Sequence, residues 1–110
     1  MKVDKLKDKA ADAAKFLKSM SNESRLLILC NLAEGEKSVG ELQSLVELSQ
    51  SALSQHLAVL RRDGIVATRR SSQTIFYCLA NAPAQEIMQI LYAHFCGTGS
   101  PRRKKASRKS

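Results

Sequence analysis

The spacing of apolar residues divides the chain into helical segments and one pair of strands. The segments in which apolar residues recur every three or four positions cover residues 4–19, 22–33, 38–46, 49–62 and 81–97. This spacing is typical of amphipathic helices. Residues 65–70 and 73–79 are rich in β-branched and aromatic side chains, which favours the strands of a hairpin. The pattern therefore predicts a mainly α fold with five helices and a small β-hairpin, an α+β domain.

The fourth helical segment has one apolar face and one polar face. Leu53, Leu57 and Leu60 share a stripe on this helix. The opposite face holds Ser51, Ser54, Gln55, Ala58 and Arg62. It is small and uncharged near its N-terminus and becomes cationic at Arg61 and Arg62. Short hydroxyl and amide side chains can meet base edges in a major groove, so this face suits DNA recognition, with a solvated surface helix as the alternative.

Signals on both sides place this helix in a helix-turn-helix. Ser49 is a suitable N-cap, and Leu48 before it can pack against Leu53 inside the helix. Gly64 supplies the left-handed residue that many helices need just beyond their end. The sequence Ser38–Glu41 is a capping box that opens a shorter helix, so two helices are joined by only a few residues.

A basic hairpin follows the second of these helices. Arg69 and Arg70 lie at the expected reversal of the chain, over residues 69–72, and would give the hairpin a positive tip. Such a tip is expected beside phosphates or in a minor groove. The order of cap, short turn, glycine stop and basic hairpin predicts a winged helix-turn-helix with a two-stranded wing.

Length and charge indicate one domain with a basic tail. The 110 residues have a net charge of +8, and the six Lys and Arg of residues 98–110 leave +2 for residues 1–97. The tail has almost no apolar residues and is expected to be disordered. It is either a solvated terminus or a segment that contacts DNA or another polyanion without specificity.

No segment has the length and composition of a membrane anchor or a secretory signal. No apolar run approaches the roughly 20 residues that span a bilayer, and the N-terminal residues lack an uninterrupted apolar core. We therefore expect a cytoplasmic protein with no membrane partner. Thiols are kept reduced in that compartment, so Cys30, Cys78 and Cys96 are not expected to form a structural disulfide framework.

The last helix has more apolar surface than one core contact requires. Its apolar residues form two stripes, Ile87, Ile90 and Leu91 on one and Met88, Tyr92 and Phe95 on the other. We expect one of these faces, together with the first helix, to form a homodimer interface. Two-fold symmetry would then place two recognition helices about one DNA turn, roughly 34 Å, apart on an inverted-repeat operator.

With these residues in view, the chain resembles the ArsR-type family of small dimeric winged-helix repressors. The resemblance extends over residues 12–96 and is strongest in LSQSALSQHLAVLRRDGIVATRR, in TIFYCL and in LKSMSNESRLLILCNL. It implies that Gln50, Ser51, Ser54 and Gln55 contact bases. With Arg61, Arg62, Arg69 and Arg70, these are the expected DNA-binding residues.

Many members of that family sense metals, but their ligands are missing here. Gln43 and Leu45 stand where a Cys-x-Cys pair would be needed, and His94 has no carboxylate or imidazole three or four positions away. A tight zinc or arsenite site needs three or four such ligands. We expect no metal and no cofactor, and we interpret His94 and His56 as packing or structural residues.

The cysteines point to another branch of the family. Cys30 and Cys96 match the two positions that define the sulfide- and persulfide-sensing branch, the SqrR, BigR and HlyU-like proteins. In that branch a disulfide or polysulfide bridge between the two thiols alters DNA binding. The ordinary alternative for Cys30 is a small hydrophobic residue of the core. Cys78, on the wing strand, is interpreted as structural.

The sequence therefore predicts a homodimeric transcriptional repressor, not an enzyme, whose inducer is a persulfide or polysulfide. A general thiol or peroxide sensor and an anti-silencing activator of the same fold remain alternatives. A small sulfurtransferase is the alternative from another class, although no histidine is paired with either cysteine in sequence. A polyanion-binding protein driven by the tail would bind DNA without operator preference.

Overall fold

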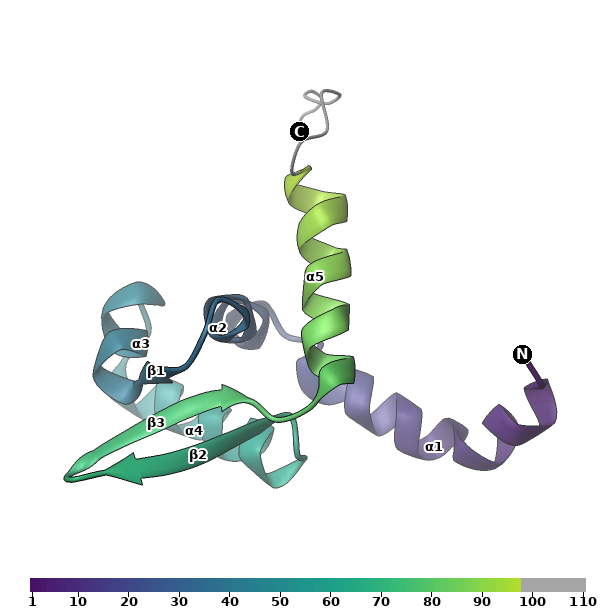
Figure 1. The fold of residues 1–110 in the computed structure, drawn as a ribbon, viewed down its shortest axis with the longest axis horizontal. Helices are drawn as coiled ribbons and strands as arrows, with labels where there is room; N and C mark the ends of the chain where they lie inside the picture. The colour runs from purple at the N-terminus through teal and green to yellow at the C-terminus, as the bar shows by residue number, and fades with distance from the viewer. Residues whose placement is uncertain (98–110) are drawn as a thin grey trace.

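The computed structural model of the protein describes residues 1–97 and has a winged-helix architecture (Figure 1). The elements in chain order are α1 (Val3–Met20), α2 (Glu23–Ala33), β1 (Lys37–Ser38), α3 (Val39–Leu45), α4 (Gln50–Arg62), β2 (Val66–Ser71), β3 (Thr74–Leu79) and α5 (Ala82–Cys96). The five helices and the hairpin predicted from the sequence are thus confirmed. The predicted disordered tail, residues 98–110, lies outside the described residues.

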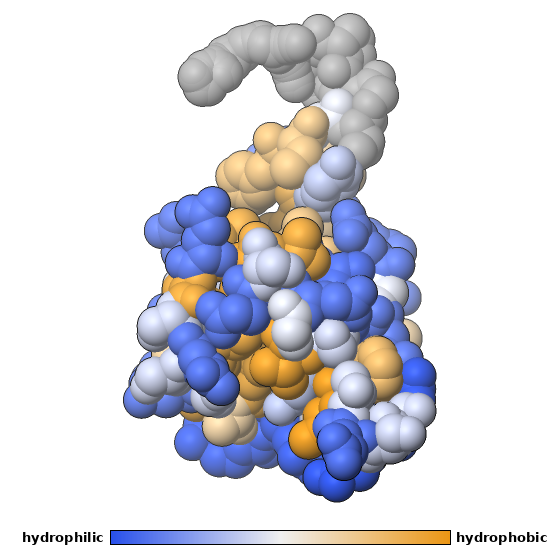
Figure 2. Space-filling model, turned by 90° about the vertical axis from the view of Figure 1, so that its left-hand side faces the viewer, coloured by the Kyte–Doolittle hydropathy of each residue, from blue (hydrophilic) through white to orange (hydrophobic). Residues whose placement is uncertain are grey.

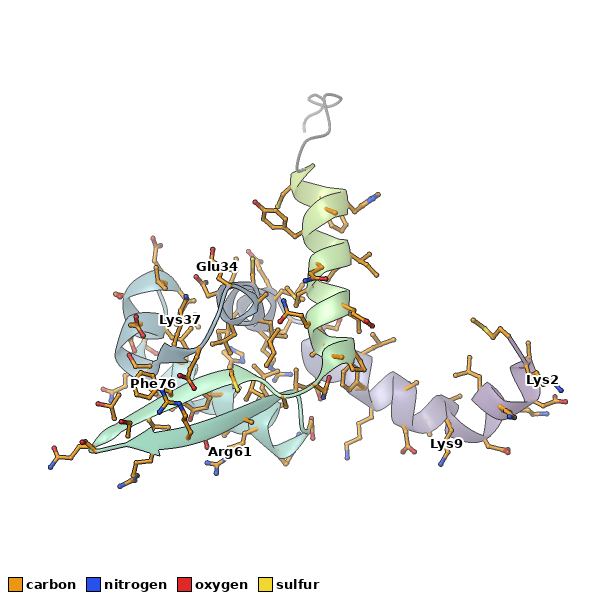
Figure 3. The ribbon with its side chains drawn as sticks, viewed as in Figure 1. Lys2, Lys9, Glu34, Lys37, Arg61 and Phe76 are labelled. Carbon is orange, nitrogen blue, oxygen red and sulfur yellow. The ribbon has the colours of Figure 1, made fainter. Side chains whose placement is uncertain are left out.

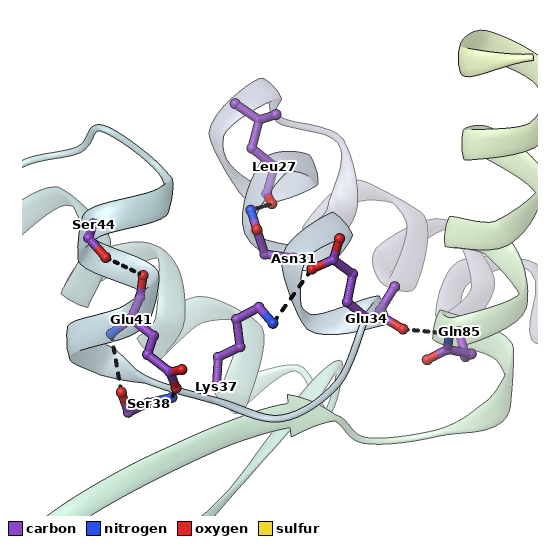
Figure 4. A network of polar contacts seen from close by, with 9 residues as sticks. Leu27, Asn31, Glu34, Lys37, Ser38, Glu41, Ser44 and Gln85 are labelled. Carbon is purple, nitrogen blue, oxygen red and sulfur yellow. Dashed lines mark hydrogen bonds and ion pairs between the residues drawn. The ribbon is translucent and has the colours of Figure 1, made fainter. Parts of the chain in front are cut away.

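Local sequence signals fix the ends of the helices. Ser38 and Glu41 form the predicted capping box, with Glu41 N donating to Ser38 Oγ at 3.1 Å and Ser38 N donating to Glu41 Oε1 at 2.8 Å (Figure 4). Ser49 Oγ accepts from Ala52 N at 3.0 Å and caps α4. Gly64 has a φ of 74°, in the left-handed region that favours glycine, and the chain leaves α4 there as predicted.

The core lies around α2, which packs against α3, α4, α5 and β3. The predicted apolar stripe of α4, Leu53, Leu57 and Leu60, is buried in it. The apolar residues of α2 do not lie on one buried stripe. Ile28, Leu29 and Leu32 are buried, and Leu26, Cys30 and Ala33 are half-buried and pack against the core. A helix with neighbours on several sides has no single inner stripe, so its apolar period does not locate the buried face.

The sheet has three antiparallel strands in the order β1-β3-β2 rather than two. The added strand, β1, has two residues and pairs with Phe76 and Tyr77 of β3. The turn of the hairpin also differs from the prediction. Arg69 and Arg70 lie within β2, paired with Phe76 and Ile75, and Ser72 and Gln73 form the loop. Ser72 has a φ of 58°, which suits the first central position of a two-residue hairpin turn.

Helices α1 and α5 extend away from this body (Figure 1). In α1 only Phe16, Ser19 and Met20 are not exposed. The two predicted stripes of α5 do not correspond to one buried face and one exposed face. Met88 is buried and Ile87 and Leu91 are half-buried, whereas Ile90, Tyr92 and Phe95 are exposed.

Candidate nucleic-acid interface and thiol pair

Helix α4 presents an exposed polar face. The residues predicted to read bases, Gln50, Ser51, Ser54 and Gln55, are all exposed. The buried leucine stripe holds the helix to the body on its other side, so this face is directed outward. Because backbone N–H groups at a helix N-terminus also attract anions, Ser49 to Ser51 form the end of α4 that is best suited to approach DNA.

The wing lies beside this face. Side chains alternate across a strand, so Arg70 shares a side of β2 with Val66, which is buried against the body. On β3, Tyr77 belongs to the same side and lines a groove of about 490 Å³ with Ser54 and Arg61. The groove between α4 and the wing therefore brings together residues far apart in the sequence. Sequence reasoning missed Tyr77, whose place follows only from the strand register.

Arg69 occupies the opposite side of the sheet and is bound within the chain. Its Nε and Nη2 donate to the two carboxylate oxygens of Glu36, each at 2.7 Å, and its guanidinium lies 4.6 Å from the centre of the Phe76 ring. The hydrogen bond from Arg69 lowers the pKa of Glu36. The predicted DNA-binding role of Arg69 therefore competes with an internal ion pair, which the sequence did not indicate.

The arginines at the end of α4 also differ from each other. Arg62 Nε and Nη2 donate to the carboxylate of Asp63 at 3.0 and 3.2 Å. These bonds, with one from Ser19 Oγ, lower the pKa of Asp63 to about 2. Within residues 1–97, Arg61 and Arg70 have no carboxylate at ion-pairing distance. Arg61 projects outward from α4 (Figure 3), so its charge is available to an outside partner.

Cys30 and Cys96 line one groove between α2 and α5. The groove has a volume of about 590 Å³ and is otherwise lined largely by apolar side chains, among them Leu26, Leu27, Met88, Leu91, Tyr92 and Phe95. Apolar residues gather around this end of α5 in the space-filling view (Figure 2). Cys78, the third thiol, is half-buried on β3 opposite Ala67 and is not among the residues that line this groove.

The two thiols of the groove differ in accessibility. Cys96 is exposed at the last residue of α5, whereas Cys30 is half-buried. Burial raises the pKa of Cys30, and the nearby negative charges of Cys96 and Glu34 raise it further. The thiolate is the reactive form of cysteine. Cys96 is therefore the more accessible thiol, and the raised pKa of Cys30 favours the protonated form of that thiol.

The histidines have partners that suit their predicted structural roles. His94 packs edge to face on Phe95, with 4.7 Å between the ring centres, and His56 Nδ1 accepts from Arg25 Nε at 3.1 Å. In the described part of the chain, no three His, Cys, Asp or Glu side chains are grouped so that they could hold a metal ion. Nor does any helix of residues 1–97 have the length and apolarity needed to cross a membrane.

A polar helix face flanked by a wing on the same side defines a winged helix-turn-helix DNA-binding regulator. Comparison with known proteins gives the family. Residues 22–68 match the family model described as "Bacterial regulatory protein, arsR family". The chain is 50% identical over 96 residues to "Transcriptional activator HlyU" of Vibrio cholerae, covering 87% of this chain and 89% of that protein. It belongs to the ArsR family of transcriptional regulators.

Other relatives agree with this assignment. The chain is 45% identical over 91 residues to "Biofilm growth-associated repressor" of Xylella fastidiosa, covering 83% of this chain and 80% of that protein. Among solved structures, BigR from Xylella fastidiosa superposes with a TM-score of 0.80 at 44% identity, over 87% of this chain and 98% of BigR. Reduced HlyU from Vibrio cholerae gives 0.79 at 51% identity, over 84% and 97%. These relatives are named as activators or repressors, not enzymes.

Proposed function

We propose that this regulator binds an inverted-repeat operator as a homodimer and that a persulfide or polysulfide switches its DNA binding through Cys30 and Cys96. The observation that carries the proposal is the shared groove, where a thiol of α2 and a thiol of α5 lie among apolar side chains. The relatives named HlyU and BigR belong to the branch that the cysteine positions indicated, and one of those structures is described as reduced.

The exposed polar face of α4 supports the DNA-binding part of the proposal. Gln50, Ser51, Ser54 and Gln55 would contact bases, because all four are exposed and short enough to work in a major groove. Arg61 and Arg70 would contact phosphates, as neither has an ion-pair partner among residues 1–97. Arg62 and Arg69 are expected to contribute less, because each is bound to a carboxylate of its own chain.

The accessibility of the two thiols gives an order of steps. The exposed Cys96 thiolate attacks the terminal sulfur of a persulfide RSSH, forming Cys96-SSH and releasing the thiol RSH. The Cys30 thiolate then attacks the sulfur next to the terminal SH, and hydrosulfide leaves. One added sulfur gives a disulfide by this route, and two give a trisulfide. The two thiols are oxidised and the transferred sulfur is reduced to sulfide.

A bridge would tie the end of α5 to α2. Because α2 packs against α4, and the C-terminal half of α5 carries exposed apolar residues suited to a dimer interface, the bridge would bias how the two recognition helices are spaced. Redox switches commonly act by shifting an interface between two arrangements. We expect the bridged form to bind its operator more weakly.

The test uses the reduced protein and a duplex selected by the wild-type protein from a randomised library. Separate samples receive glutathione persulfide, glutathione disulfide, hydrogen peroxide or zinc, and each is measured by DNA-binding anisotropy and intact mass. Only persulfide should link Cys30 to Cys96, by a disulfide or through an added sulfur atom, and release the duplex. Cys30→Ser and Cys96→Ser should abolish the response, and Cys78→Ser is the matched control that should keep it.

Other results would overturn the sulfur-sensing proposal in different ways. The same bridge and release with peroxide would make the protein a general thiol sensor. Repeated transfer of sulfur from many equivalents of donor by one equivalent of protein would indicate a sulfurtransferase. A normal persulfide response in both the Cys30 and the Cys96 variant would show that this pair is not the switch.

A further inference from the structure

A polar cluster behind the recognition helix joins α1, α2 and α4, and we call it the Ser19 clamp. It consists of Ser19 in α1, Arg25 in α2, His56 in α4 and Asp63 directly after α4. Arg25 Nη1 donates to the carbonyl oxygen of Ser19 at 3.2 Å, and Arg25 Nε donates to His56 Nδ1 at 3.1 Å. Ser19 Oγ donates to Asp63 Oδ2. The last turn of α1 is thus joined to α4 near its middle and at its end.

Two of the clamp residues are shielded from water, which strengthens the hydrogen bonds they form. Ser19 is 5% exposed and the Asp63 side chain 6%, so water competes poorly for their bonds. The buried leucine stripe of α4 turns its polar face outward, and the hydrogen bonds of the clamp add directional constraints to the rotation that non-directional apolar contacts set. Hydrogen bonds donated by a planar guanidinium are directional, and the guanidinium of Arg25 donates to both α1 and α4.

The hydrogen bond between Arg25 and His56 limits which side chains can replace either residue. Arg25 Nε can only donate, so His56 Nδ1 accepts and carries no proton. A lysine at position 25 would keep the charge but would not present two donors at fixed angles. An asparagine at position 56 would keep an acceptor close to the position of Nδ1, whereas a leucine of similar size would leave Arg25 Nε without a partner.

From this geometry we infer that Arg25 is a positioning residue for DNA recognition, which sets the rotation of α4 relative to α1 through the Ser19 clamp. The inference rests on the proposed role of the α4 face in reading bases. Contacts to phosphates tolerate small changes of helix orientation, while contacts to base edges do not. Loss of the clamp should therefore lower the preference for operator over random DNA more than it lowers binding to DNA in general.

The experiment measures the affinities of Arg25→Lys, His56→Leu and His56→Asn for the selected duplex and for a random duplex, with the unfolding midpoint of each variant. Arg25→Lys and His56→Leu should each reduce the operator-to-random ratio by about tenfold, the usual size of a lost charged hydrogen bond. His56→Asn should restore most of the ratio. The double variant of Arg25→Lys and His56→Leu should lose little more than Arg25→Lys alone, because His56→Leu removes only a bond that the change at Arg25 already removes.

Ile28→Val provides the control for stability, since it alters a fully buried residue of α2 outside the clamp. It should lower the unfolding midpoint without changing the operator-to-random ratio. The inference is overturned if the clamp variants behave as Ile28→Val does, or if His56→Asn is as impaired as His56→Leu. A wild-type protein with no operator preference would instead contradict the proposed base-reading role itself.

Discussion

Helices α4 and α5 are both amphipathic, but only α4 buries all of its apolar stripe. Leu53, Leu57 and Leu60 are enclosed by the chain itself, and the face left exposed is polar. In α5, Ile90 is 67% exposed, Tyr92 48% and Phe95 77%. The difference indicates two kinds of partner, because a polar face suits the grooves of DNA, while clustered exposed apolar residues indicate a protein interface.

Helix α1 belongs with α5 in this comparison. Leu6 and Leu17 are exposed along it, and α1 and α5 share a groove in which Phe16 and Leu17 face Pro83 and Ile87. A second copy of the chain, placed by a two-fold axis, would cover the apolar surface of both helices. The proposed dimer thus accounts for the apolar residues that the single chain leaves exposed.

The largest expected effect comes from breaking that dimer. Ile90→Lys places a charge on the most central of the exposed apolar positions of α5 and should give a monomer. Operator affinity should fall by about a hundredfold or more, because two linked recognition helices bind far more tightly than one. Sedimentation velocity and anisotropy measure the two effects. Gln89→Lys, also exposed on α5, is the matched control, and an Ile90→Lys dimer with normal affinity would contradict the proposal.

The polar face of α4 predicts a smaller effect that depends on sequence. Ser54→Ala and Gln55→Ala should each reduce discrimination between operator and mismatched duplex by about 1 to 3 kcal/mol, the usual worth of a good base contact. Anisotropy titrations on duplexes with single base-pair changes measure this. Gln89→Ala alters a polar residue far from α4 and should have no effect. Equal losses on operator and random DNA would remove both side chains from base recognition.

The two wing arginines should differ in how much each contributes to the salt dependence of DNA binding. Arg70→Ala should weaken binding to all DNA and reduce the slope of log affinity against log salt by about one unit, as expected for one lost phosphate contact. Arg69→Ala is the matched variant on the other side of the sheet and should change the slope less, since its charge is paired with Glu36. The reverse order of effects would show that the wing meets DNA with its other side.

The smallest expected effect is on the stability of the folded protein at acid pH, and it comes from Asp63 at the end of α4. The pKa of Asp63 falls from 3.8 to about 2 in the folded protein, so its contribution to stability is complete above the unfolded pKa and is lost as the pH falls from about 4 to 2. Asp63→Asn should therefore flatten the pH dependence of the unfolding midpoint in that interval. Thermal unfolding followed by circular dichroism measures it, and an unchanged slope would contradict the pairing of Asp63 with Arg62 and Ser19.

The features that the sequence predicted well depend on neighbouring residues. A hydroxyl cap at Ser49, a capping box at Ser38 and a left-handed glycine at Gly64 each act within a few positions, so their outcome follows from local chemistry. The leucine stripe of α4 was also predictable, because that helix has one buried face and one exposed face.

The features that the sequence could not predict depend on residues far apart in the chain. Strand β1 has only two residues and no periodic pattern. The pairing of Arg69 with Glu36 spans 33 positions and that of Arg25 with His56 spans 31, and nothing local distinguishes these arginines from Arg61 or Arg70. The pairing of Cys30 with Cys96, which line one groove, was implied by a family resemblance and not by spacing.

In the proposed complex, two copies of this chain present two α4 helices to one duplex. Sedimentation equilibrium of the reduced protein, alone and with the selected duplex, measures this stoichiometry directly. We expect a dimer in solution and two chains per duplex. A monomer in solution that binds as one chain per duplex would contradict it.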